Sequence, residues 1–143
     1  MRVFSCFLTI VGLGIVALSA SATTLPHAGV FVFSSLCQGE ADPHGAEIIL
    51  IRGPAGNTAV YTRTEGGIAA PLLAYGPDVE IVEQTGRISL RFVDPELKNF
   101  ADGGVYKYDG LVTAEAMDLT GGYAAKLHLP RVRTFDTKLR RCQ

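Results

Sequence analysis

The sequence contains no tryptophan, only two methionines and only three cysteines among its 143 residues. The absence of tryptophan excludes a binding interface anchored on that side chain, so tyrosine or phenylalanine would have to take this role. A G-x-S-x-G turn for a nucleophilic serine and a Walker loop for phosphate are also missing. We therefore expect no enzyme of a recognisable class. The alternative is an active site whose residues converge from distant strands.

Metal-binding patterns are missing as well. None of the three histidines, His27, His44 and His128, belongs to a doublet such as H-x-x-x-H. Glu40, Asp42 and His44 are close together in one turn-rich segment, but their spacing matches no recognised calcium or zinc loop. The sequence therefore predicts no metal and no cofactor.

Two pairs of carboxylates could serve acid and base chemistry, namely Glu115 with Asp118 and Asp78 with Glu80. Asp78 and Glu80 share one face of a predicted strand, a pattern that is typical of a solvated surface. We interpret these groups as surface charges and assign no catalytic residue.

The first 22 residues have the composition of a secretory signal peptide. Arg2 supplies a positive charge, residues 7–18 are apolar, and Ala20-Ser21-Ala22 fits the small-x-small pattern of a cleavage site. An uncleaved anchor is the alternative, because residues 3–22 carry no charge. We expect cleavage, and hence a periplasmic or secreted protein with a signal peptide, residues 1–22, and a single β domain, residues 23–143.

Cleavage would leave an even number of cysteines, because Cys6 belongs to the signal peptide. Cys37 and Cys142 stand near opposite ends of the mature chain, in a compartment where disulfides persist. We expect them to form one intramolecular disulfide with Cα atoms within about 6 Å. Two free thiols or intermolecular pairing are the alternatives. The bond would bring the first and last strands together and favour closure of the sheet.

Short alternating runs of apolar and polar residues, separated by glycine-bearing turns, predict an all-β fold. We expect a single small antiparallel β-barrel or sandwich of about eight strands. The predicted strands are Val30–Leu36, Ala46–Arg52, Thr58–Thr64, Asp78–Glu83, Arg87–Val93, Val105–Tyr108, Leu111–Leu119, Tyr123–Leu129 and Val132–Leu139.

Two further segments interrupt this pattern. A short helix is predicted over residues 95–101, because Asp94 can cap it, Pro95 suits its first position and Gly103 follows it. Residues 68–75 predict only an edge strand or an irregular loop, since Pro71 excludes a central strand.

The turn residues also predict the register of two hairpins. A two-residue turn at Thr85-Gly86 would pair Ile81 with Leu90, Val79 with Phe92 and Glu80 with Arg91. At Gly121-Gly122, a two-residue turn would place Glu115 opposite His128, whereas a three-residue loop would place Glu115 opposite Leu127. Both alternatives for the second hairpin remain open.

The net charge of −1 hides an uneven distribution. Residues 23–125 carry 6 Lys and Arg against 13 Asp and Glu, whereas residues 126–143 carry 6 against 1. One interpretation is a basic patch for an acidic partner, an anionic lipid or a polysaccharide. Its candidate residues are Arg131, Arg133, Lys138, Arg140 and Arg141. The other is a basic last strand beside acidic strands, which requires no partner.

The positions of Cys37 and Cys142 in an exported β protein of this size resemble those in small periplasmic lysozyme inhibitors of the C-type class. The resemblance covers only the architecture and the disulfide. The serine-bearing loop motif of that family is absent from this sequence. We therefore assign no site residue from it.

Two functions fit these observations. The first is an exported binding module, inhibitor-like or interacting with the envelope, which would use the basic patch together with the loops at Gly66-Gly67 and Gly121-Gly122. The second is a small-ligand carrier whose barrel cavity would be lined by residues such as Phe31, Phe33, Tyr61 and Phe92. The expected partner is an envelope or extracellular protein, or a small apolar ligand, and no nucleic acid. Contact with a membrane is expected only if the signal peptide stays uncleaved.

Overall fold

The computed structural model describes residues 25–40, 42–65, 72–95, 103–122, 124–134 and 139–142. These residues form an all-β fold, as predicted, with no helix among them, so none of them belongs to a helix that could cross a membrane. The strands are β1 (Gly29–Ser34), β2 (Cys37–Gln38), β3 (Pro43–Gly53), β4 (Gly56–Glu65), β5 (Leu72–Val82), β6 (Arg87–Val93), β7 (Val105–Val112), β8 (Ala116–Gly121) and β9 (Ala124–Val132). The signal peptide lies outside the described residues, as does the predicted helix apart from Pro95, which is in a turn.

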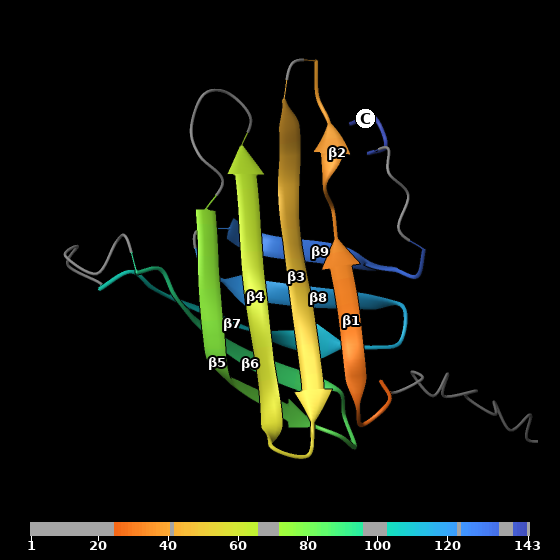
Figure 1. The fold of residues 1–143 in the computed structure, drawn as a ribbon, viewed down its shortest axis with the longest axis vertical. Coiled ribbons are helices and arrows are strands. Elements are labelled where there is room, and N and C mark those ends of the chain that lie inside the picture. The colour runs from red at the N-terminus through yellow and green to blue at the C-terminus, as the bar shows by residue number, and fades with distance from the viewer. Residues whose placement is uncertain are drawn as a thin grey trace, which may run out of the picture.

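Eight strands close into an antiparallel barrel, so the structure decides between the barrel and the sandwich. Neighbouring strands follow the order β3 to β9, and β1 joins β9 to β3. The front layer of the barrel consists of β5, β4, β3 and β1, and the strands from β6 to β9 cross behind it (Figure 1). The first and last barrel strands pair as predicted, but only through Val32 with Val132 and Phe33 with Arg131. The seam that closes the barrel is therefore short.

Side chains that alternate inward along the strands fill the barrel. Tyr61, Phe92 and Tyr108 pack ring against ring, with centroids 5.2, 5.6 and 6.1 Å apart. The hydroxyl of Tyr108 donates to that of Tyr61 over 3.2 Å, so these two buried polar ends satisfy each other. The other large side chains that are fully buried are Phe33, Ile48, Leu50, Leu90, Met117, Leu119 and Leu129. Burial of each contributes about 1.5–3 kcal/mol, which makes the barrel interior the main source of stability.

A buried arginine organises one end of the barrel. Arg52 is 5% exposed, and its Nη1 donates to the carbonyl oxygens of Leu25 and Pro26 over 3.0 and 2.8 Å. Its Nη2 forms an ion pair with Glu83, in the loop between β5 and β6. The side chain of Leu25 belongs to the hydrophobic core. Arg52 therefore ties the segment before β1 and the β5–β6 loop to the end of β3.

The predicted register of the β5–β6 hairpin is wrong by two residues. Val82 pairs with Arg87 and Val79 with Leu90, so the loop contains four residues instead of two. The amides of Thr85 and Gly86 both donate to the carbonyl oxygen of Val82, which closes the turn early. A shift of two keeps every side chain on its predicted face, because side chains alternate with period two. The predicted pair of Glu80 with Arg91 is lost, since Glu80 pairs with Ser89 and Arg91 with Asp78.

Neither predicted register of the β8–β9 hairpin is correct. Asp118 pairs with His128, and a β-bulge between Leu119 and Gly121 shifts the register near the turn. The Nδ1 atom of His128 lies 2.6 Å from a carboxylate oxygen of Asp118. Glu115 instead forms an ion pair with Arg133, beyond the end of β9. Gly121 pairs with Ala124, so the pairing next to the turn already differs from both predictions, and the bulge shifts the rest of the hairpin by one more residue.

Three predicted strand boundaries are also wrong. β7 continues to Val112, and Thr113 instead of a glycine makes the turn that follows it. The hydroxyl of Thr113 accepts hydrogen bonds from the amides of Glu115 and Ala116. Residues 72–75 belong to β5, a strand between β4 and β6, and its Pro77 is accommodated where the register shifts between Tyr75 and Asp78.

The third error concerns the last strand. β9 continues through Pro130 to Val132, and Arg133 and Thr134 follow it outside any strand. Pro130 is tolerated because β1 pairs with β9 only at Arg131 and Val132, so no ladder bond to β1 requires an amide at Pro130. The remainder of the predicted final strand lies partly in residues 135–138, outside the described residues.

Candidate functional site

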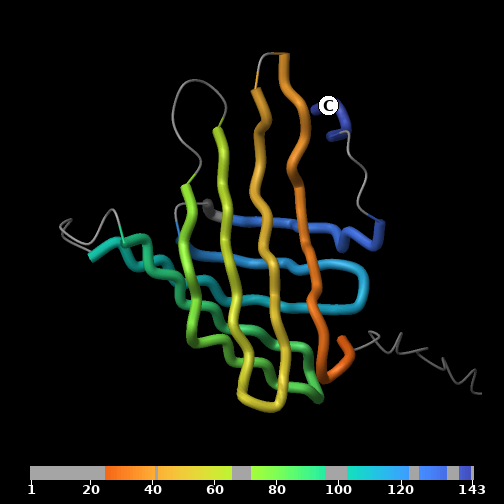
Figure 2. The backbone as a smooth tube through the Cα atoms, in the orientation of Figure 1, coloured from red at the N-terminus to blue at the C-terminus, as the bar shows by residue number. Residues whose placement is uncertain are grey.

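The disulfide attaches the end of the chain to the barrel. Cys37 and Cys142 are bonded across 105 positions of sequence, with Cα atoms 5.0 Å apart, as predicted. The amide of Gln38 donates to the carbonyl of Arg140 over 2.6 Å, and the amide of Cys142 donates to the carbonyl of Gln38 over 3.1 Å. Residues 139–142, which we call the C-terminal strap, therefore run alongside β2, as the tube trace shows (Figure 2). The barrel itself is closed by β1 and β9, and the disulfide lies beyond that seam.

A groove of about 430 Å³ opens on the outside of the barrel between the seam and the strap. We call it the seam groove. Val32 and Ser34 face outward by alternation with the core residues Phe31 and Phe33, yet they are only 7% and 9% exposed. Its lining residues are Val32, Ser34, Leu36, Glu47, Pro130, Arg131, Val132, Arg133, Thr134, Leu139 and Arg140. The lining of the groove thus combines apolar side chains with three arginines and one glutamate, although Arg131 is paired with Phe33 on the inward face of β9.

The five cations of the predicted basic patch do not form one surface. The guanidinium of Arg131 lies 4.7 Å from the ring centroid of Phe31, and its Nη1 donates to the carbonyl of Ala114 over 3.4 Å. Arg133 is used in the ion pair with Glu115, while Lys138 lies outside the described residues.

Arg140 and Arg141 remain as the cations that are available to a partner. Both are exposed on the strap, and within the described part of the chain neither forms an ion pair. Their backbone is held in place by the disulfide and by the hydrogen bonds to Gln38. The strap therefore carries two exposed arginines on a held backbone, and one of them, Arg140, lines the groove.

The glycine loops that we expected to join the patch are not placed beside it by the structure. Gly66-Gly67 lies outside the described residues. Gly121 and Gly122 are in the turn before β9, whereas the groove uses the residues at the end of that strand. The groove is thus a feature of the strap and the seam alone.

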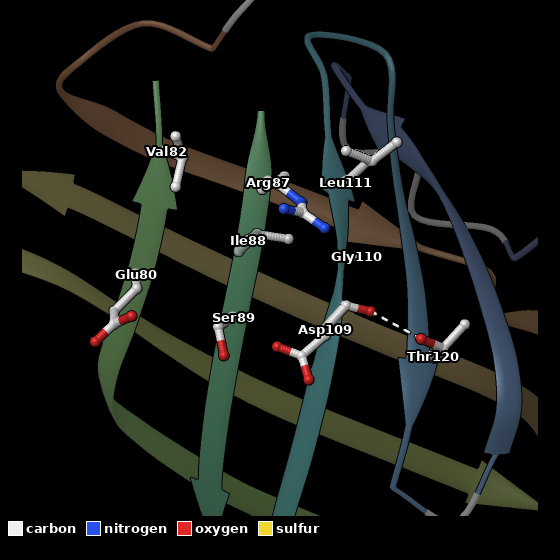
Figure 3. Close-up of a pocket in the computed structure, with 9 residues that line it drawn as sticks. All are labelled: Glu80, Val82, Arg87, Ile88, Ser89, Asp109, Gly110, Leu111 and Thr120. Atoms are coloured by element: carbon white, nitrogen blue, oxygen red, sulfur yellow. Dashed lines mark hydrogen bonds between the residues drawn. The ribbon is translucent and has the colours of Figure 1, made fainter. Parts of the chain in front are cut away.

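A second groove, of about 520 Å³, lies on the opposite layer of the barrel. In register across β5 to β8, Glu80, Ser89, Asp109 and Thr120 form one row on the outer face, and the hydroxyl of Thr120 donates to the carbonyl of Asp109 (Figure 3). Within the described residues, no group of three or more His, Cys, Asp or Glu could hold a metal ion. The row is a solvated strand surface, and we assign it no chemistry.

The residues that we considered for metal binding or acid and base chemistry are scattered in the same way. His27 lies 3.6 Å from a carboxylate oxygen of Glu83, and His44 stands opposite Glu65 on β4. Glu115 and Asp118 are each paired with a different cation, Arg133 and His128. Asp78 and Glu80 are exposed on the outer face of β5.

The barrel interior does not resemble the cavity of a carrier. The four aromatic residues expected to line such a cavity, Phe31, Phe33, Tyr61 and Phe92, are at most 3% exposed and belong to the core cluster. A guest in the interior would have to displace them. The sequence pattern did predict that these positions face inward, but it could not show that their rings contact one another.

The seam groove could not be found from the sequence, because its two walls come from opposite ends of the chain. The available signal was the outward alternation of Val30, Val32 and Ser34, combined with a disulfide that returns the C-terminus to this strand. No protein-family model, curated protein or solved structure matches the chain, so its function is argued from these residues alone.

Proposed function

We propose that this protein is an exported binding module, which recognises a protein partner in the cell envelope or outside the cell through the seam groove and the C-terminal strap. The observation that carries this proposal is the exposed Arg140, which lines the groove, with the exposed Arg141 next to it on the strap. The predicted signal peptide and the disulfide between Cys37 and Cys142 support export.

The chemistry of the groove indicates what the partner presents. Val32, Val132 and Leu139 would contact an apolar side chain, while Arg140 and Arg141 would contact a nearby carboxylate. Because the disulfide already fixes the strap, binding would cost less conformational entropy than the ordering of a free C-terminus. An inhibitor of an extracellular enzyme and a subunit of an envelope complex are both members of this class.

Charge reversal of the strap tests the proposal. We expect Arg140→Glu together with Arg141→Glu to lower capture of a partner from envelope or extracellular extract by about tenfold or more, as measured by quantitative mass spectrometry. The matched control is Lys107→Glu together with Lys126→Glu, which reverses two exposed charges on β7 and β9, away from the strap. Far-UV circular dichroism of both variants should show an unchanged fold.

Equal capture by the wild-type protein and both variants would overturn the proposal. Native mass spectrometry of the same preparation tests the carrier alternative, because a copurified apolar ligand would show that the interior opens. The intact mass tests export, since the cleaved protein should begin at Thr23.

A further inference from the structure

The two layers of the barrel have outer faces of very different composition. We call the outward side chains of β1, β3, β4 and the first part of β5, as far as Tyr75, the front face, since these segments form the near layer (Figure 1). Beyond the register shift after Tyr75, β5 pairs with β6 and carries the exposed Asp78 and Glu80, which are not part of this face. The front-face positions are Val30, Val32, Ser34, Glu47, Ile49, Ile51, Thr58, Val60, Thr62, Thr64, Leu73 and Tyr75. Among these described positions, only Glu47 is charged.

The outer face of the other layer has the ordinary composition of a solvated surface. Its outward side chains on β6 to β9 include Arg87, Arg91, Lys107, Asp109, Asp118, Lys126 and His128, with Ser89, Leu111 and Thr120 between them. Both faces belong to the same barrel and both are reached by solvent. The low charge of the front face therefore reflects its own surroundings and not the requirements of the fold.

Large apolar side chains on the front face are exposed and lie in register. Val30, Leu73, Tyr75 and Ile51 are 63%, 61%, 52% and 42% exposed. Strand pairing places Tyr75 beside Val60, Val60 beside Ile49, and Ile49 beside Val32. The result is one continuous apolar row across four strands. Contiguous patches of this kind mark interaction surfaces in proteins.

We propose that the front face is the interface of a homodimer, in which two barrels pack sheet against sheet. A twofold axis brings the same face of each copy together, so the face must not repel itself. The front face has one carboxylate among its described outward positions, so two copies of it would repel each other little. The outer face of β6 to β9 carries more charges, so two copies of that face would bring more like charges together. Homodimer interfaces are also more apolar than transient ones.

The size of the front face is adequate for a stable dimer. β3 and β4 pair over ten residues, whereas β1 has six and β5 pairs with β4 over five. At about 3.4 Å per residue and about 4.8 Å between strands, the projected area is about 500 Å². The relief of the side chains raises the accessible area toward the ~600 Å² per partner at the lower end of specific interfaces.

The experiment compares two substitutions of the same kind on opposite faces. Leu73→Lys places a charge on the front face, and Leu111→Lys places it on the outer face of β7, where Leu111 is 49% exposed. Sedimentation velocity of the exported protein over a range of concentrations should show a dimer for the wild type and for Leu111→Lys. Leu73→Lys should weaken the dimer by about tenfold or more, because each twofold interface would then bury two lysines.

A wild-type protein that is monomeric at all concentrations would overturn the proposal, whatever else occupies the face. Equal dimerisation by the two lysine variants would also overturn it. Because Leu73 and Leu111 are exposed, both variants should fold, and Ile51→Lys provides a second substitution on the front face.

The dimer goes beyond the proposed function, although the front face and the seam groove share Val32, Ser34 and Glu47 at their common edge. The two proposals are separated by substitutions outside these shared residues. The strap variant with Arg140→Glu and Arg141→Glu should remain dimeric, since both residues lie on the strap and not among the front-face positions. A monomeric strap variant would place the interface at the strap and overturn the assignment to the front face.

Discussion

Replacement of both disulfide cysteines by serine should lower the stability of the barrel without unfolding it. In the native state the disulfide joins β2 to the C-terminal strap, outside the ladder that closes the barrel. The core side chains and the eight barrel strands do not depend on that bond for their contacts. The variant with Cys37→Ser and Cys142→Ser should therefore fold to the same barrel, with a less ordered strap.

The magnitude follows from the length of the closed loop. A separation of 105 residues gives a loop-closure entropy in the unfolded chain that is worth about 4.7 kcal/mol at 25 °C. Total stabilities of such domains are about 5–15 kcal/mol, so the bond would supply a large share. With an unfolding entropy of about 250 cal/mol/K for about 120 residues, the melting temperature should fall by about 19 °C.

Urea unfolding followed by circular dichroism and tyrosine fluorescence measures the loss. The chain has no tryptophan, so the fluorescence reports on its five tyrosines, of which Tyr61, Tyr106 and Tyr108 are buried in the core. Wild-type protein in reductant is the matched control, because it should unfold at the same urea concentration as the double serine variant. The m-value should rise without the disulfide, since the unfolded chain then exposes more surface.

A loss of less than about 1 kcal/mol would refute the entropic reasoning, because it would show that the unfolded chain gains little freedom when the bond is removed. Different stabilities for the reduced wild type and the serine variant would refute the assignment of the effect to the disulfide alone.

Two further substitutions test contacts inside the barrel. Gly110→Ala should cost about 2–4 kcal/mol, because its new Cβ would overlap the backbone oxygen of Asp118 on the paired strand; Gly53→Ala is the control, since no atom lies within 4 Å of a Cβ there. Arg52→Met should cost about 3 kcal/mol, because it leaves two carbonyl oxygens without their donor and breaks the ion pair with Glu83. Chemical denaturation measures each difference, and a cost for Gly110→Ala that is no larger than that for Gly53→Ala would contradict the close approach of the two strands.

The strands and the disulfide could be predicted because their signals are local. Alternation of apolar and polar residues identified the strand Arg87–Val93 with its correct bounds. The cysteine count after removal of the signal peptide predicted the bond between Cys37 and Cys142. Both inferences need only residue types and their order along the chain.

Register and boundaries failed where a contact from elsewhere decided them. Glu83 was expected in a strand, but it is in the β5–β6 loop and paired with Arg52 of β3. Glu115 was expected opposite a residue of β9, but the turn position and a bulge together shift the β8–β9 register, and Glu115 forms an ion pair with Arg133. The registers differ from the predicted ones by two residues in the β5–β6 hairpin and by three or four in the β8–β9 hairpin, and the local sequence does not distinguish them.

The candidate site was predicted only in part. The charge count showed that the end of the chain is rich in cations, but it did not show that Arg131 packs over Phe31 or that Arg133 pairs with Glu115. Which arginines remain available depends on what surrounds each one, and a count of charges contains no such information.

The sequence by itself determined the fold class, the inward-facing positions and the pair of cysteines that form the disulfide. Alternation with period two and the number of cysteines can both be read from residue types and their order along the chain. Only the tertiary structure decided that the sheet closes, that the strap and the seam enclose a groove, and that the barrel has one nearly uncharged outer face. These properties depend on residues that are distant in sequence and become neighbours across strands. Strand pairing decides which side chains share one outer face, and the order of residues along the chain does not.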